Sequence, residues 1–271
     1  MGLTNGPGGA AVGAACSALL SVGFLLGRPR PWFRAVLLAA IASALFTLYL
    51  SQVRALVMVT AVGLLSLSVP FAAQRRVGRF FSFATFVFIG GFLVFLLAVS
   101  VGGEAVTGRL STLFETNPAS AYYDNRGIML RYTFFEGLPE YPLGAGLGRW
   151  GPISNYFSDT VNSAPKIGAE LQWTGWLLDG GGPLILASAA GLWIALRTCL
   201  RIASRENGAS GEAFQRWATV AFGYSVAMIA LTLGATPFQT TLGIDFWLVN
   251  AVVFAASRQL QTESGDSASG I

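Results

Sequence analysis

The chain contains no histidine, a single lysine and two cysteines, and only 11% of its 271 residues are charged. The missing histidine excludes imidazole bases and histidine-ligated metal or haem sites. Cys16 and Cys199 both lie in apolar stretches, so the sequence suggests neither a disulfide framework nor a metal clip. Because a soluble domain carries about 25% charged residues, the composition excludes a water-soluble globule.

The chain is rich in long apolar segments: 54% of its residues are hydrophobic, and its mean hydropathy is +0.60. A helix needs about 20 mainly apolar residues to cross the hydrocarbon core of a bilayer. Seven segments come close to that length: 9–27, 34–51, 53–73, 80–101, 182–199, 214–234 and 240–257. The sequence therefore predicts an all-α, polytopic helical membrane protein with about seven transmembrane helices.

These segments divide the chain into four parts. Residues 1–101 are expected to hold transmembrane helices 1–4, and residues 182–258 helices 5–7. Between them, residues 102–181 form one long external loop, and a loop of that length is improbable in a compact protein unless it is functional. Residues 259–271 are small and polar, which predicts a disordered tail.

Basic residues predict the orientation. Eleven follow the first, third, fifth and seventh spans, namely Arg28, Arg30, Arg34, Arg75, Arg76, Arg79, Arg197, Arg201, Arg205, Arg216 and Arg258. The opposite side has six, namely Arg54, Arg109, Arg126, Arg131, Arg149 and Lys166. The positive-inside rule therefore places the N-terminus and residues 102–181 outside, and the C-terminus in the cytoplasm. Met1 would lie outside without a signal sequence, so we expect the C-terminal portion of a larger protein.

The external loop is expected to contain two short helices. Residues 126–138 are apolar on nearly every face, which suits a helix wedged between the bundle and the membrane interface. On it Arg126 and Arg131 would point about 140° apart, so one is expected to be catalytic and the other structural or interfacial. Gly180-Gly-Gly-Pro183 would break a helix, which separates a short helix over 167–178 from the fifth span.

A glycine-rich turn follows the first of these helices. Pro142-Leu-Gly-Ala-Gly-Leu-Gly148 has the spacing G-x-G-x-G, and no strand precedes it, so a dinucleotide site is excluded. Glycines here would let the backbone approach a neighbour or a ligand closely. Nearby aromatic residues predict an interfacial belt, with stacking on sugar rings as the alternative: Trp150, Trp173, Trp176, Tyr141 and Tyr156.

Four stretches, in their order and spacing, carry a resemblance to a known family. They are Gly2-Leu-Thr-Asn-Gly-Pro-Gly-Gly-Ala10, Leu50-Ser-Gln-Val-Arg-Ala-Leu56, Arg126 followed by Pro142-Leu-Gly-Ala-Gly-Leu-Gly148, and Leu171-Gln172 followed by Asp179-Gly180 and Pro183-Leu184. Together they resemble the O-antigen ligase and polymerase superfamily. Its members are membrane glycosyltransferases that act on lipid-linked oligosaccharides at the periplasmic face of the bacterial inner membrane.

The resemblance implies a GT-C-like helical fold and a donor glycan joined through a diphosphate to a polyprenyl carrier, with a glycan or lipid acceptor. It implies contact with membrane lipids but no cofactor, metal or nucleic acid. Arginine binds phosphate oxygens bidentately and keeps its charge. The expected roles are catalysis by Arg126 and Glu170, and binding of the diphosphate or glycan by Arg54, Arg131, Gly144 and Gly146.

Each candidate also has a simpler interpretation. Arg54 could reach lipid phosphates, and Arg126 could pair with Asp124 or with another carboxylate of the loop. Glu170 could be a hydrogen-bonded carboxylate at a helix start. Arg131 and Arg149 could simply anchor the loop, and the acidic residue Asp179 could be structural. Asp245 lies inside the seventh expected span, where it could pair with Arg54.

One departure from the family pattern separates the possible activities. Ligases of the superfamily carry a His-Asn pair just before Leu171-Gln172, and this chain has Ile167-Gly168 there. We therefore expect an O-antigen or exopolysaccharide polymerase rather than a ligase, which would transfer the glycan to the lipid A core or to protein. A transporter or flippase of a lipid-linked solute also fits the composition, as does an inactive homologue that serves as a membrane scaffold.

Overall fold

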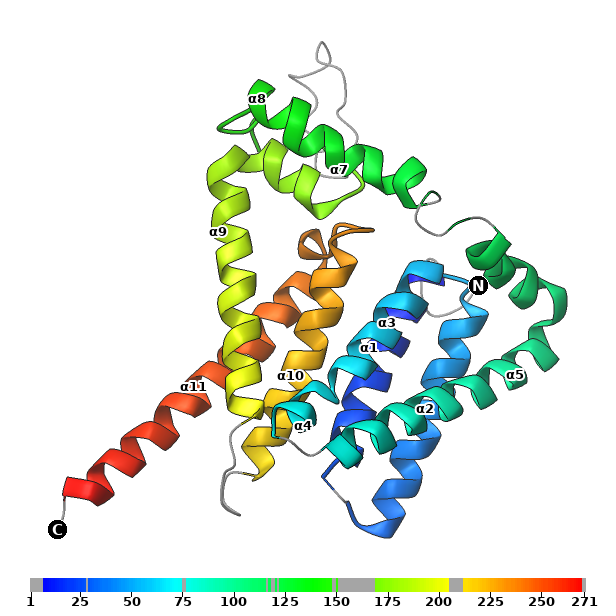
Figure 1. The fold of residues 1–271 in the computed structure, drawn as a ribbon, viewed down its shortest axis with the longest axis vertical. Helices are drawn as coiled ribbons and strands as arrows, with labels where there is room; N and C mark the ends of the chain where they lie inside the picture. The colour runs from blue at the N-terminus through cyan, green and yellow to red at the C-terminus, as the bar shows by residue number, and fades with distance from the viewer. Residues whose placement is uncertain are drawn as a thin grey trace. The chain divides into compact units, whose positions relative to one another are not determined.

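The computed structural model describes residues 7–27, 29–74, 77–115, 117, 120, 122–147, 150, 169–204 and 212–269. Throughout this part of the chain every regular element is a helix, as Figure 1 shows. The chain divides into two compact units. We call them the span unit (Met1–Thr112, Ala195–Met228 and Asp245–Ile271) and the loop unit (Leu113–Ile194 and Ile229–Ile244). The predicted all-α class is confirmed for the described residues.

Within the described ranges, five helical segments are long and apolar enough to cross a membrane. They coincide with the first five expected spans. Their elements are α1 (Pro7–Leu25), α2 (Pro31–Leu50), α3 with α4 (Arg54–Ser66 and Val69–Ala73), α5 (Val77–Glu115) and α9 (Gln172–Ala203). Membrane-length helices of this composition are typical of a polytopic membrane protein.

The sixth and seventh expected spans coincide with helices that lack an apolar stretch long enough to cross a membrane. The helix α10 (Glu212–Leu231) begins with polar residues, among them Gln215 and Arg216, which lower its hydropathy. In α11 (Thr241–Ser269) only Thr241–Ser257 is apolar. Helix α11 also continues to Ser269, through residues for which the sequence predicts a disordered tail. Residues 259–269 contain no proline, so each of them keeps the backbone N–H that a helix needs.

Glycines bring two helices of the span unit into close backbone contact. A Cβ on Gly63 of α3 would lie 2.9 Å from the Cβ of Ala227, and one on Gly223 of α10 would lie 3.1 Å from the carbonyl oxygen of Gly63. In lipid, helices associate through close van der Waals packing at small residues of this kind. The pair therefore fixes where α3 and α10 cross.

A buried polar network lies among the parts of α9, α10 and α11 that belong to the span unit. The Cys199 thiol donates to Oδ1 of Asn250, at 3.2 Å. The Asn250 amide donates in turn to Oγ of Ser225, at 3.3 Å, and to the carbonyl of Phe246, at 2.8 Å. Cys199 and Asn250 are almost fully buried. Buried polar groups cost free energy unless they are hydrogen-bonded, so this network fixes the relative rotation of the three helices.

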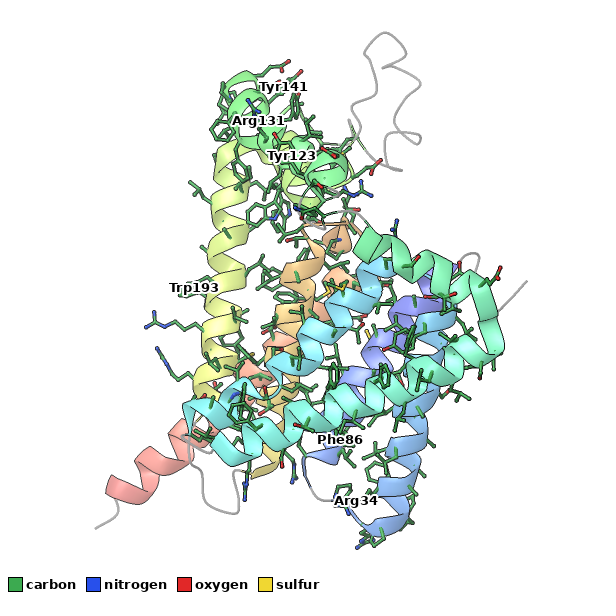
Figure 2. All side chains as sticks on the ribbon, turned by 45° about the vertical axis from the view of Figure 1, so that its right-hand side comes forward. Arg34, Phe86, Tyr123, Arg131, Tyr141 and Trp193 are labelled. Atoms are coloured by element: carbon green, nitrogen blue, oxygen red, sulfur yellow. The ribbon has the colours of Figure 1, made fainter. Side chains whose placement is uncertain are left out.

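Helix α5 is the most exposed of the long helices. Only 6% of its apolar segment Val77–Glu104 is buried, and large side chains such as Phe86, which Figure 2 labels, stand open. The helix bends at Gly103, where φ is 55° and ψ is −140°, and then continues to Glu115. The sequence predicts that this span ends at residue 101, two residues before the bend at Gly103. The first part of the expected loop, up to Glu115, is helical.

Candidate functional site

The loop unit contains a helical segment of unusual winding between Tyr123 and Glu140. Two π-helical turns, Tyr123–Gly127 and Thr133–Gly137, alternate with α7 (Ile128–Tyr132) and α8 (Leu138–Glu140). The helix expected over 126–138 is therefore present, and it begins three residues earlier. A π turn holds an extra residue, and such turns occur frequently at functional sites because they redirect side chains.

Arg126 and Glu170 form an ion pair. Arg126 lies in the first π turn, and Glu170 lies two residues before α9, so the contact joins parts of the chain 44 residues apart. The side chains are 33% and 57% exposed, respectively. Both groups are thus held together while remaining open to an incoming molecule. The structure brings together the two residues that the sequence proposes as catalytic. It also agrees with the simpler interpretation of Arg126, because its partner Glu170 is a carboxylate of the expected loop.

The second arginine of this segment has a different partner. Nη1 of Arg131 donates to the Tyr123 hydroxyl at 3.4 Å, and both residues are labelled on this segment in Figure 2. That hydrogen bond raises the pKa of the fully exposed Arg131. The hydroxyl of neighbouring Tyr122 donates to the carbonyl of Leu233 at 3.0 Å. The pKa of Tyr122 is raised because burial outweighs the opposite effect of the nearby Arg126 charge. Arg126 and Arg131 therefore have separate surroundings, as their spacing predicts.

Buried hydroxyl groups attach the segment to the start of α9. Thr133, in the second π turn, and Thr174 share a hydrogen bond of 2.8 Å, and both side chains are buried. Thr133 also donates to the carbonyl of Met129 at 2.8 Å. Because these hydroxyls satisfy one another away from solvent, they hold the Arg126 segment in one position against α9.

The glycine-rich turn packs directly against the break in α9. Backbone N–H groups of Ala145 and Gly146 donate to the carbonyl of Leu178, at 2.7 and 3.1 Å, and Gly182 N–H donates to the carbonyl of Pro142, at 2.9 Å. A Cβ on Gly144, whose φ is +93°, would lie 2.8 Å from the backbone nitrogen of Gly180. Only glycine permits this approach, so Gly144 contacts a neighbouring backbone.

The break itself occurs where the sequence predicts it. Gly180 and Gly181 have non-helical backbone angles, with φ of −155° and +62°, and Pro183 follows. A Cβ on Gly181 would collide with the carbonyl oxygen of Pro142. Gly146 differs from both, because its φ is +107° but a Cβ there would meet open space. Of the two glycines proposed to bind substrate, Gly146 thus faces outward and Gly144 faces the break.

Trp150 is a core residue of the loop unit. It is 2% exposed, and its indole lies over Gly175, where a Cβ would collide with the ring. Its Nε1 donates to Oδ1 of Asp179 at 2.9 Å. Trp176 is also buried, at 8% exposed, so the predicted interfacial belt is wrong for these two residues. The buried N–H group of the Trp150 indole finds its acceptor in Asp179, 29 positions later in the chain.

Replacing Trp150 with phenylalanine tests this arrangement. The variant keeps an aromatic ring but leaves the half-buried Asp179 carboxylate without its donor, so we expect a loss of about 1 kcal/mol in unfolding free energy. Asp179→Ala should cost a similar amount. Thermal melts in detergent of both variants and of the double variant form a cycle. A double variant whose loss equals the sum of the two single losses would contradict the contact.

Gln172 holds the loop that contains Thr232, Ala235 and Phe238. The family resemblance names Gln172 only as part of a motif. Its N–H is directed to the carbonyls of Thr232 and Ala235, at 3.3 and 3.0 Å, and its Oε1 accepts from the N–H of Phe238, at 2.9 Å. Trp173 adds a hydrogen bond from Nε1 to the Thr232 hydroxyl, at 3.1 Å. These contacts fix the start of α9, two residues after Glu170.

Two further sequence candidates lie in the span unit. Arg54 is the first residue of α3 and follows a tight turn in which Gln52 has φ of 57°. Asp245 lies on α11 and lines a mostly apolar cavity of about 340 Å³ together with Cys16 and Tyr224. Arg149, Tyr156 and Ile167-Gly168 lie outside the described residues. Among the residues that the structure describes, no group of three or more His, Cys, Asp or Glu is placed to hold a metal ion.

The site of the loop unit thus combines a permanent cation with a carboxylate, both partly open and both held by buried contacts. A guanidinium group binds phosphate oxygens through paired hydrogen bonds, and a carboxylate accepts a proton from a hydroxyl. No family model, curated protein or solved structure matches the chain. The function is therefore argued from the residues and their arrangement.

Proposed function

We propose that the chain belongs to a glycosyltransferase that extends a glycan carried on a polyprenyl diphosphate, at the periplasmic face of the bacterial inner membrane. The observation that carries the proposal is the Arg126–Glu170 ion pair in the loop unit. It unites a phosphate-binding group and a proton acceptor on a membrane protein in which charge is scarce. The proposal includes seven spans and the GT-C-like arrangement expected from the sequence.

Arg126 is the group that binds the donor diphosphate. Its side chain is one-third exposed, so an anionic oxygen can take the place of the Glu170 carboxylate on the guanidinium without unfolding the segment. Negative charge grows on the diphosphate as it departs, and a fixed guanidinium stabilises that charge more in the transition state than in the ground state. Exposed Arg131 provides a second positive charge on the same segment.

Glu170 is the group that accepts the proton. In the transfer step, the acceptor hydroxyl oxygen bonds to the anomeric carbon of the donor sugar while the bond from that carbon to the diphosphate oxygen breaks. The hydroxyl proton passes to Glu170, and the bonding pair leaves with the diphosphate. When Arg126 turns to the diphosphate, Glu170 is released from its ion pair and becomes available to the hydroxyl.

Deleting the complete gene in its host, and restoring it, tests the proposed activity. Surface and lipid-linked glycans are then separated by size. Loss of long chains, with single repeats still on the surface, is the expected result for a polymerase. Long chains that accumulate on the lipid carrier would instead indicate a ligase. An unchanged glycan profile would exclude both transferases and favour a transporter or scaffold.

A further inference from the structure

A second polar site lies in the span unit and shares no residue with the first. Five helical segments meet around a cavity of about 400 Å³: the C-terminal ends of α1 and α9, α4, and the N-terminal parts of α5 and α10. Its polar wall contains two guanidinium groups, Arg79 and Arg216, with Gln74, Gln215 and Thr219. No acidic residue is among the described residues that line it, so the cavity is electropositive.

The wall of the cavity is held in place by hydrogen bonds. The side-chain amides of Gln74 and Gln215 both donate to the carbonyl of Ala203, at 3.1 and 2.9 Å, which ties α10 and the residue after α4 to the end of α9. Arg216 donates from Nη1 to the carbonyl of Gly27 at 3.4 Å. A Cβ on Gly27 would lie 2.7 Å from Cδ of Arg216, so glycine makes room for the arginine stem.

An apolar cavity adjoins the polar one and shares Gly27 and Arg216 with it. This second cavity has a volume of about 180 Å³ and is lined by Phe24, Phe33, Trp217 and Val220. Phe24 and Trp217 pack edge to face, with ring centroids 5.0 Å apart. A cationic cavity beside an aromatic one matches a molecule that carries an anionic group beside a hydrocarbon chain, whereas a soluble phosphate would need only the first.

We propose that these adjoining cavities bind one anionic phospholipid, with its phosphate between Arg79 and Arg216 and part of an acyl chain against Phe24 and Trp217. Guanidinium groups bind phosphate oxygens through short, charge-assisted hydrogen bonds. The cavity lies at the helix ends that the arginine distribution assigns to the cytoplasm, where anionic lipids attract basic residues. The bound lipid would link α1, α5 and α10 at that membrane surface.

Quenching of tryptophan fluorescence by brominated lipid tests the proposal. The full chain is placed in phosphatidylcholine nanodiscs, and phosphatidylglycerol with brominated acyl chains is added in increasing proportion. Bromine close to Trp217 quenches its emission. We expect half-maximal quenching at about one tenth of the mole fraction that brominated phosphatidylcholine requires, because two guanidinium groups favour the anionic lipid. Trp217→Phe should remove the difference.

Arginine variants identify the groups responsible. Arg79→Gln with Arg216→Gln should abolish the preference for phosphatidylglycerol. The matched pair Arg197→Gln with Arg201→Gln removes two charges from exposed positions on α9 and should keep it. If the first pair does not fold, Arg79→Glu alone reverses the charge of an exposed side chain and should also abolish the preference.

The outcomes are distinct. Equal quenching by the two lipids in the wild type, or an equal loss in both variant pairs, would overturn the proposal. Millimolar inorganic phosphate, compared with chloride at the same ionic strength, separates the two sources of a phosphate group. In discs without phosphatidylglycerol, a change in Trp217 emission caused by phosphate but not by chloride, together with equal quenching by the two lipids, would show that the cavity takes a soluble phosphate and would overturn the lipid assignment.

Discussion

Replacing Arg126 with lysine is expected to lower transfer turnover by about 100- to 1,000-fold, the effect of losing one group that stabilises developing negative charge. Lysine keeps the positive charge but has no planar fork, so it cannot bind two phosphate oxygens in parallel or pair with Glu170 in the same geometry. The measurement is polymer formation from purified lipid-linked donor by the protein in bilayers, at equal protein abundance.

Arg131→Lys provides the matched control. It makes the same chemical change five residues away, at an exposed side chain that contacts Tyr123. We expect less than about a tenfold loss, because lysine keeps the positive charge that exposed Arg131 contributes. Glu170→Gln should also reduce turnover, because an amide cannot accept the proton of the acceptor hydroxyl. Wild-type turnover by the Arg126 variant would exclude the proposed role.

Gly181→Ala is expected to cost more than about 3 kcal/mol of unfolding free energy, since it combines a strained backbone with a steric collision. The φ of +62° disfavours any residue with a Cβ, and that Cβ would collide with the carbonyl oxygen of Pro142. The same collision pushes away the turn that carries Gly144. Thermal unfolding in detergent measures the loss, and limited proteolysis of the turn reports its detachment.

Two other glycines serve as controls for that experiment. At Gly146, φ is +107° but a Cβ would meet open space, so Gly146→Ala tests backbone strain alone. It should lower the unfolding free energy by about 1–2 kcal/mol. Gly90→Ala, in α5, has neither strain nor a neighbour within 4 Å and should stabilise the helix by up to about 1 kcal/mol. Equal melting temperatures for the Gly181 and Gly90 variants would contradict the close approach of Gly181 to Pro142.

Features determined by neighbouring residues were predictable from the sequence. The interruption at Gly180 and Gly181 follows from three consecutive glycines and a proline, whose backbone preferences are local. The five membrane-length helices follow from hydropathy over about 20 residues. The different surroundings of Arg126 and Arg131 follow from helical spacing, even though the segment contains two π turns.

Features determined by packing were not predictable. Trp150 has the composition of an interfacial residue, but a glycine 25 positions later leaves room for its ring in the core. The pairing of Arg126 with Glu170 and the hydrogen bond from Phe238 to Gln172 depend on how the chain returns to α9. The sequence proposed Arg126 and Glu170 separately, and had no means of placing them in contact.

The exposed apolar stretch of α5 makes the protein sensitive to membrane thickness. The 24 residues between Arg79 and Glu104 would span about 36 Å as a straight helix, against a hydrocarbon core of about 30 Å. Since little of this stretch is held by other helices, the mismatch is relieved by tilting or by local thickening of the bilayer, at a modest cost per ångström. Lipids with longer acyl chains should therefore raise the melting temperature, and short-chain lipids should lower it.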